Sequence, residues 1–301
     1  MTADSAADAY GDVSGLVERS AASYAASVPE DPADDGFFGP RSVTWRLSTD
    51  LSGVIGGLRS LMVQALHPLA MAGVDQHSDW RQDPVGRLAA TQSYVTTVSV
   101  GDRATAERLS ERVRRIHEHV RGTDPVTGQP YAADDPGLLL WVHAALVDST
   151  VVAVRMFGAG LSDQDADRYV AEMVAAAELV GIPGAMVPAS VAALEEYLNS
   201  VRPVLQATPA ARESMAYLLD PPGLDPDVAE IWQDVREGTI ASLPDWARDL
   251  YGYQLDAPLT DERRTEIRQA LGVLDTVFLA EPGVLEARQR LTLRIRAART
   301  A

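Results

Sequence analysis

The stretch DPGLLLWVHAALVDSTVVAVRMFG, residues 135–158, decides the fold predicted for this chain. Asp135 followed by Pro136 is typical of a helix start, because the carboxylate accepts hydrogen bonds from free N–H groups and proline suits the first helical position. The segment after it is apolar almost all round, which indicates a helix buried on every side. We therefore expect a helical protein packed around this segment.

Helical patterns follow one another on both sides of this central segment. The first, at 44–74, is interrupted at His67-Pro68, because proline has no N–H and clashes with the preceding turn. The others are expected at 83–101, 102–122, 161–184, 190–200, 208–219, 226–238, 260–275 and 284–299. Strict alternation of apolar and polar residues is not sustained anywhere, so strands are few.

The predicted fold class is therefore all-α, a single-domain helical bundle of about ten helices. We expect this domain to span residues 36–301. Residues 1–35 are small, acidic and poor in large apolar side chains, which favours a disordered N-terminal arm.

Composition excludes several classes of function. The net charge of −17 argues against nucleic acid as a partner and disfavours anionic membrane surfaces. The absence of cysteine excludes disulfides, thiolate-ligated haem and Cys-ligated zinc. The start lacks a basic n-region and an apolar h-region, and the longest apolar run, 137–147, is too short to span a bilayer. We expect a soluble, cytoplasmic protein without stable membrane insertion.

The segment VRRIHEHVRG, residues 113–122, concentrates histidine and arginine. On a helix over 102–121, Arg114 and Arg121 lie three residues before and four residues after His117, within one narrow arc. Neighbouring cations keep an imidazole unprotonated, as a metal ligand requires, and arginines can pair with carboxylates. A solvated basic face is the alternative, and the residues alone favour it.

Two further histidines lie on apolar segments. His143 is expected to be buried, so it needs a hydrogen-bond partner or a metal. A core histidine satisfied by a hydrogen bond is the simpler alternative. His67 precedes the helix-breaking Pro68, which frees the Gln64 carbonyl. Such breaks often line cavities, although a structural kink is commoner.

Arg87 and Thr91 lie four residues apart on one helix face, where the arginine could anchor an anion or polarise a bound oxygen. A surface ion pair is the alternative. Taken together, three histidine-bearing apolar helices with arginines and no cysteine fit a His-ligated, non-covalently held haem b. A His-rich non-haem metal site also fits, but it usually includes carboxylates.

Four blocks in order resemble the MpaB-like and rubber-oxygenase (latex-clearing protein) family, a widespread bacterial domain. The resemblance covers about residues 37–215. The blocks are LMVQALHPLAMAGVDQHSDWRQDPVGRLAATQSYVTTVSVG, VRRIHEHVRG, TGQPYAADDPGLLLWVHAALVDS and LVGIPGAMVPASVAALEEYL. The resemblance implies a globin-reminiscent all-α fold with a central pocket for one haem b, and an oxygenase that uses O2.

The resemblance also implies roles for single residues. His117 matches the proximal iron ligand, with Arg114 and Arg121 flanking it. Arg87 and Thr91 match the pair on the distal side.

Two more histidines match the family's blocks. His143 matches a histidine needed for haem retention, and His67 matches that of the LHP block, without an assigned role. One departure concerns the lysine that precedes the distal threonine in rubber-cleaving members. Here that position is Ala90, and the whole chain lacks lysine, since all 26 basic residues are arginine. Rubber cleavage itself is therefore doubtful.

We thus expect a haem-b-dependent oxygenase that acts with O2 on an unidentified hydrophobic small molecule, isoprenoid-like in character. A haem protein with a peroxidase-like, gas-sensing or carrier role and no oxygenase activity is the alternative. A third possibility is a helical protein with no cofactor. The sequence does not determine the oligomeric state.

Overall fold

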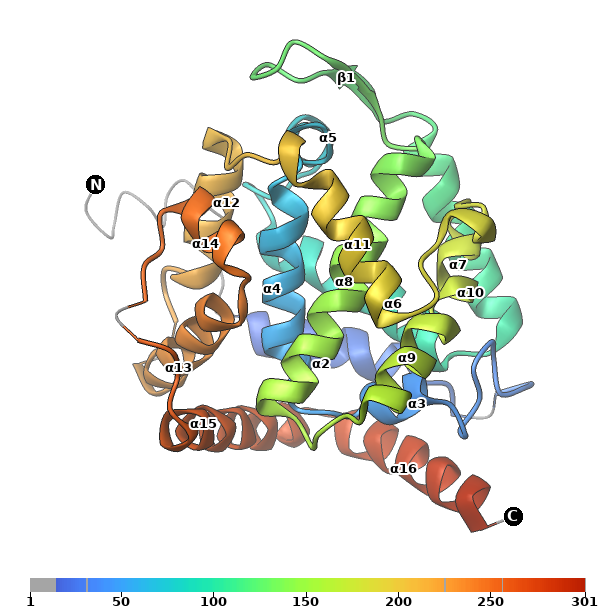
Figure 1. Cartoon of the computed structure of the whole chain (residues 1–301). Helices are drawn as coiled ribbons and strands as arrows, with labels where there is room; N and C mark the ends of the chain where they lie inside the picture. Colours follow the sequence, from blue (N-terminus) through green and yellow to red (C-terminus); the bar gives the residue numbers. More distant parts are fainter. Residues whose placement is uncertain (1–14, 31, 225, 256, 301) are drawn as a thin grey trace.

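The computed structural model describes residues 15–30, 32–224, 226–255 and 257–300. Within these ranges the chain is all-α apart from one small antiparallel hairpin, which confirms the predicted fold class (Figure 1). The α-helices are α2 (Leu16–Ser27), α3 (Val43–Leu47), α4 (Gly53–Ala65), α5 (Pro68–His77), α6 (Pro84–Val100), α7 (Arg103–His117), α8 (Pro136–Phe157), α9 (Asp163–Glu172), α10 (Val174–Leu179), α11 (Val191–Val201), α12 (Pro209–Leu219), α13 (Pro226–Ser242), α14 (Asp245–Tyr251), α15 (Asp261–Ala280) and α16 (Val284–Thr300). Two 3-10 turns are η1 (Gly184–Met186) and η2 (Arg202–Val204), and the strands are β1 (Arg121–Thr123) and β2 (Pro130–Ala132).

Helix α8 is the central element, as predicted. It begins where expected, because the Asp135 carboxylate accepts hydrogen bonds from the N–H groups of Gly137 and Leu138 at 2.8 and 3.1 Å. α8 packs along α4, and the glycine at position 56 permits the close approach, since a Cβ there would lie 3.3 Å from that of Ala153. Among the described residues α8 alone is long and apolar enough to cross a membrane, but half of its apolar stretch is buried in the protein. This burial is typical of a core helix.

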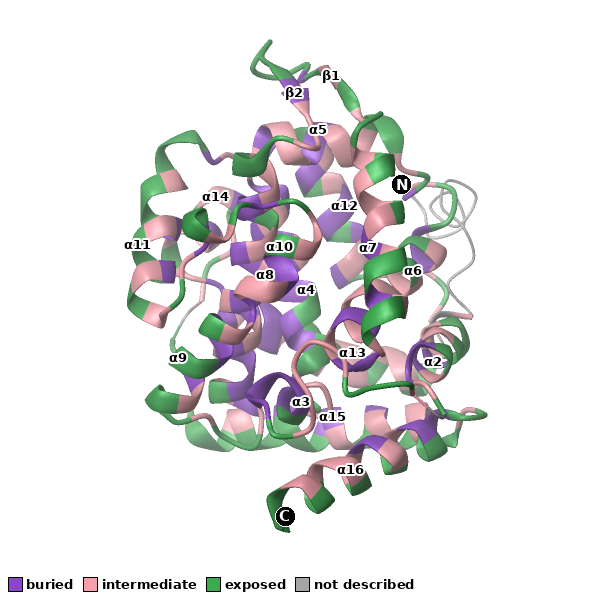
Figure 2. Ribbon diagram, turned by 90° about the vertical axis from the view of Figure 1, so that its right-hand side faces the viewer, coloured by how far each residue is buried: buried purple, intermediate pink, exposed green. Residues whose placement is uncertain are grey.

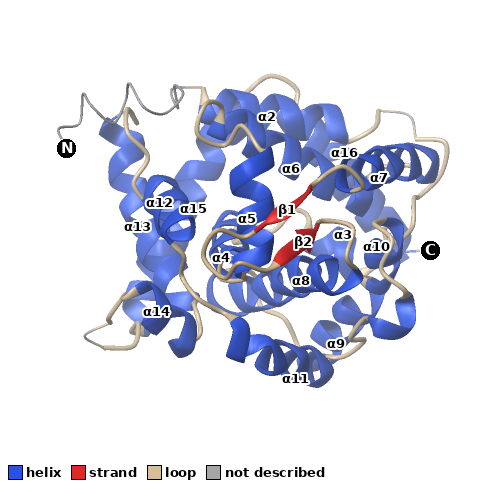
Figure 3. Cartoon of the chain, turned by 90° about the horizontal axis from the view of Figure 1, so that it is seen from above, coloured by secondary structure: helices blue, strands red, loops and turns tan. Residues whose placement is uncertain are grey.

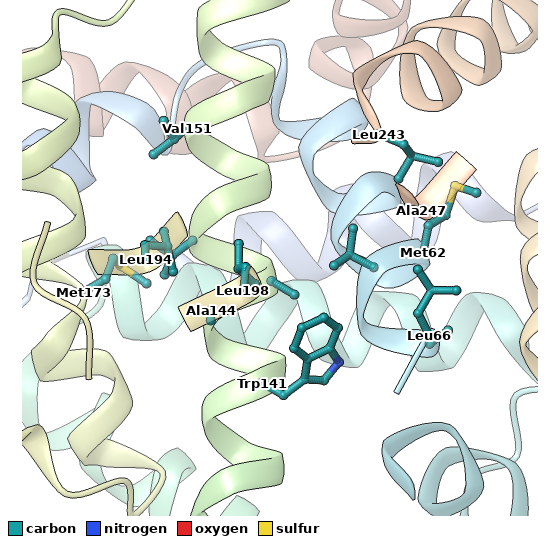
Figure 4. Close-up of a cluster of buried hydrophobic side chains, with 14 of the residues drawn as sticks. Met62, Leu66, Trp141, Ala144, Val151, Met173, Leu194, Leu198, Leu243 and Ala247 are labelled. Carbon is teal, nitrogen blue, oxygen red and sulfur yellow. The ribbon is translucent and has the colours of Figure 1, made fainter. Parts of the chain in front are cut away.

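The main core lies around α8 and α4. Figure 4 shows Trp141 and Ala144 of α8 beside Leu66 and Met62, with Leu198 contributed by α11. All five side chains are buried. Figure 2 shows the same pattern for the whole chain, with buried residues inside and exposed residues on the outer helix faces.

The expected break at His67-Pro68 separates α4 from α5. Both carbonyls released there have found partners. The Gln64 carbonyl accepts a hydrogen bond from Trp141 Nε1 at 3.0 Å, and the Leu66 carbonyl accepts one from the N–H of Gln206 at 2.9 Å. The break is therefore sealed by residues distant in sequence, and its cost is reduced because both of these carbonyls keep a hydrogen bond.

Helix α7 ends earlier than expected. The predicted helix ran to Gly122, but α7 stops at His117, and Arg121 pairs with Ala132 as the first residue of β1. The hairpin explains the difference: once strand pairing with 130–132 satisfies the backbone, a helix no longer holds residues 121–123. Figure 3 shows this hairpin seen from above, and in Figure 1 it projects beyond the helices.

Part of the expected N-terminal arm is ordered. Residues 16–27 form α2, which packs along α6. Small residues make this possible: Ser23 Oγ donates to the Ala89 carbonyl at 2.8 Å, and Ser27 Oγ lies 2.9 Å from Ser93 Oγ. Small residues thus let α2 approach α6 closely, while Tyr24 of α2 is buried and packs edge-on against Phe278 of α15. Residues 1–14 lie outside the described residues.

The helices after residue 190 lie close to the expected ranges, and α14 is the addition. It spans only seven residues and ends at Gly252, whose φ of 80° is left-handed. Short helices such as α14 and α3 bring the described chain above the expected ten. They are too short to show a clear 3.6-residue period, so the sequence gives no signal for them.

Candidate functional site

His117 is the last residue of α7. Its pKa is lowered, mainly by burial and then by the nearby positive charge of Arg87, while Asp134 opposes the shift. Its Nδ1 is buried without a hydrogen-bond partner, and within the described ranges no other group bonds to the ring. The lowered pKa favours a neutral His117 imidazole, and its ring nitrogens have no hydrogen-bond partner among the described residues.

Arg87 lies one turn into α6 and close enough to His117 to influence its charge. Protein around the guanidinium lowers the pKa of Arg87, yet the side chain retains accessible surface. Arg87 is therefore an exposed side chain whose guanidinium has protein close to it on one side. In the part of the chain that the structure describes, no carboxylate or carbonyl pairs with this guanidinium, so the surface-ion-pair alternative finds no support.

Thr91 shares the helix face of Arg87. Its Oγ1 donates to the Arg87 carbonyl at 3.0 Å and retains lone pairs that can accept a further hydrogen bond. Tyr94 lies on the same face three residues on, and its hydroxyl is 3.3 Å from Ser110 Oγ of α7. Sequence analysis missed Tyr94, although its spacing of seven from Arg87 was a usable signal.

Arg114 and Arg121 are arranged differently from the expected single arc. Because α7 ends at His117, Arg121 stands on β1. Both guanidinium groups are also occupied. Arg114 donates to the Leu179 carbonyl at 2.5 Å and pairs with Glu111, and Arg121 pairs with Asp134 at 2.6 Å. In the structure, Arg114 and Arg121 hold neighbouring segments together. A role of these two arginines in holding a ligand stays a prediction.

His143 lies on the central helix α8. Burial lowers its pKa to about 4, yet no hydrogen bond reaches its ring from any described residue. The structure therefore does not support the alternative of a core histidine satisfied by a hydrogen bond.

The helices that carry these residues pack on different partners. α6 packs on α2 and α7, whereas α8 packs on α4 and α11. Among the described residues, α8 makes no comparable packing with α6 or α7.

His67 begins α5 as its N-cap, and its ring lies 6.0 Å from that of Trp141. Burial lowers the pKa of His67, with Asp135 opposing, and its Nδ1 is buried without a partner. The remaining acid of interest, Asp148, pairs with the buried Arg59 at 2.7 Å and is not available as a ligand.

The structure brings Arg87, Thr91 and His117 together. Within the described ranges, no interaction joins His67 or His143 to that group. The same ranges contain no cluster of three or more histidine or acidic side chains that could hold a metal ion by themselves. A non-haem metal centre, which needs several protein ligands, therefore has no candidate set there.

Fold and site together define a helical protein in which histidines on separate helices are kept neutral and largely unpaired. The chain belongs to the family described as "ER-bound oxygenase mpaB/B'/Rubber oxygenase, catalytic domain", which it matches over residues 45–276. This match confirms the family resemblance and identifies the chain as an oxygenase catalytic domain by family. No curated protein and no solved structure matches the chain.

Proposed function

We propose that the protein is a haem-b-dependent oxygenase that acts with O2 on a hydrophobic small molecule of isoprenoid-like character. The observation that carries the proposal is the unpaired Arg87 beside the neutral, unpaired His117. Family membership supplies the oxygenase class. The cofactor and substrate are our inference.

The residues present fit a haem b. A histidine that holds haem iron would have to be neutral with a free nitrogen, and burial together with Arg87 favours that state in His117. An accessible guanidinium without a carboxylate or carbonyl partner among the described residues suits a negatively charged or polarised group, such as a propionate or bound oxygen. The weak packing of α8 against α6 and α7 is consistent with a flat group between them.

In this proposal His117 is the protein ligand to iron, and His143 helps retain the cofactor from α8. A bound haem would supply an iron that binds and activates O2. Arg87 would orient a bound oxygen or substrate oxygen by hydrogen bonding, and Thr91 would hold a water or proton at Oγ1 next to it. The burial that lowers the pKa of His143 also limits water at the site.

The exposed side chains next to His143, Arg87 and Thr91 are apolar, which favours an apolar substrate. Val142 of α8, next to His143, is 38% exposed although its helix is central. Ala90, between Arg87 and Thr91 on α6, is exposed and uncharged. A hydrophobic molecule is the class that such walls accept.

Ala90 also supports a second candidate. Without a lysine at this position, the same residues would suit a haem protein with a peroxidase-like or gas-sensing role. Oxygen uptake with candidate alkenes separates the two functions, since only an oxygenase consumes O2 in proportion to substrate.

The decisive experiment is the absorption spectrum of the hemin-loaded protein beside that of His117→Ala. We expect a Soret band in the wild type and its loss or a marked shift in the variant. His119→Ala is the matched control, because His119 is exposed and its Nδ1 contacts only the Arg115 carbonyl. A wild-type chain that takes up no hemin, or a His117→Ala spectrum identical to it, would overturn the assignment.

A further inference from the structure

A small apolar cavity lies between α4, α6, α12 and α13. Its walls are two prolines and the following side chains: Leu58, Val85, Leu88, Tyr217, Leu218 and Trp232. Its free volume is about 20 Å³. That is room for one molecule of about the size of water and far too little for an isoprenoid substrate.

The cavity is unsuited to water. A buried water needs two to four polar partners, and of the lining residues only Tyr217 and Trp232 carry a polar side-chain group. The Trp232 Nε1 is buried without a hydrogen bond, and Tyr217 has an interaction partner in the protein. A small space with such walls stays dry and favours apolar occupants.

Leu88 connects this cavity to the candidate site. It follows Arg87 directly and lies three residues before Thr91, so the side chains of Leu88 and Thr91 are neighbours on the surface of α6. The cavity therefore adjoins the face that carries the proposed oxygen-binding residues, with the Leu88 side chain between them.

We propose that this cavity is a docking site for molecular oxygen, from which O2 reaches the face of α6 that carries Arg87 and Thr91. O2 is the occupant because it is small and apolar, and because the proposed function, on which this inference rests, consumes it. The larger hydrophobic substrate cannot enter through this cavity, because the free volume is too small. The gas-sensing alternative would use the same cavity.

The test is methyl NMR of the purified chain under O2 and under N2 pressure, without added haem. O2 is paramagnetic and speeds the relaxation of nuclei that it contacts. We expect the methyl groups of Leu58, Val85 and Leu88 to relax much faster under O2. The surface methyl groups of Val204 and Leu293, which are 54% and 64% exposed, should show only the smaller effect of O2 in bulk solution.

Two variants sharpen this test. Leu88→Phe should fill the cavity and abolish the extra relaxation at Leu58 and Val85, whereas Leu88→Met, of similar volume, should retain it. If Leu88→Phe does not fold, Leu218→Phe fills the cavity from α12. Equal relaxation at cavity and surface methyl groups, or extra relaxation that survives in a folded Phe variant, overturns the proposal. A chain that shows O2 docking but takes up no hemin would refute the proposed function alone.

Discussion

Trp141 Nε1 donates a hydrogen bond of 3.0 Å to the Gln64 carbonyl, which is the acceptor that Pro68 deprives of its helical partner. Trp141 is completely buried, so no water can replace this donor. The bond joins the central α8 to the break between α4 and α5, and it fixes His67 at that break.

Trp141→Phe tests this relationship. Phenylalanine keeps most of the apolar contact but removes one of the two donors to the Gln64 carbonyl, which still accepts from the His67 N–H at 3.2 Å, so we expect the free energy of unfolding to fall by about 1 kcal/mol. Urea denaturation measures it. Trp246→Phe, on the partly exposed face of α14, is the control and should change stability by less than about 0.5 kcal/mol. Equal effects of the two changes would contradict the argument.

The ion pair between Arg59 and Asp148 should be the most costly one to break. Arg59 is 3% exposed and also donates to Ser149 Oγ at 2.7 Å. Asp148→Ala leaves this guanidinium buried with its charge unpaired, so we expect a loss of about 3–5 kcal/mol in thermal or urea unfolding. Asp163→Ala, which breaks the exposed pair with Arg155, should cost less than about 1 kcal/mol.

His143 should make stability depend on pH. Its pKa is about 4 in the folded chain and near 6.5 when unfolded, so the unfolded chain takes up the proton first as the pH falls. Stability is therefore complete above about pH 6.5 and declines towards pH 4. Between pH 7.5 and 5.5 we expect His143 to account for a loss of about 1 kcal/mol.

Comparison of wild type with His143→Leu isolates this contribution. The variant should lose less stability than the wild type over the same pH interval in urea denaturation of the cofactor-free chain. His119→Leu, at an exposed position, should behave like the wild type. A His143→Leu variant with an unchanged pH dependence would show that His143 is protonated normally in the folded state.

Arg87 should favour the haem-loaded chain without stabilising the cofactor-free one. Because Arg87 is exposed, Arg87→Met should change the free energy of unfolding of the cofactor-free chain by less than about 0.5 kcal/mol. Hemin affinity should fall roughly tenfold, because a charged hydrogen bond is lost. Calorimetry and hemin titration measure the two effects. Arg108→Met, on the exposed side of α7, should change neither.

The long helices were predictable from the sequence, but the segments against which they pack were not. The helix starts expected near residues 83, 135 and 161 are confirmed, and each is capped by a side chain close to it in sequence, namely Asp83, Asp135 and Ser162. The predicted end of α7 was wrong. The helix stops early because Arg121 pairs with Ala132, eleven residues away, and a local pattern does not carry this pairing. α2 was missed because its docking depends on small residues that fit against α6.

The candidate site also contains features that the sequence predicted and features that it did not. The sequence named Arg87, Thr91 and His117. For Arg114 and Arg121 it left two interpretations open, cations that flank a ligand and a solvated basic face, and the structure shows both guanidinium groups engaged by carbonyl or carboxylate groups. Which arginine lacks a partner depends on the whole set of surrounding acids and carbonyls. No local pattern carries that information.

By itself, the sequence determined most of the long helices, the break at Pro68 and the family, since these follow from local periodicity, capping and ordered motifs. The tertiary structure alone decided that Gln64 is paired through Trp141, that Arg87 is the arginine left unpaired next to His117, and that His143 has no hydrogen bond. Burial and pairing depend on contacts between residues far apart in the chain, and these exist only once the helices have packed.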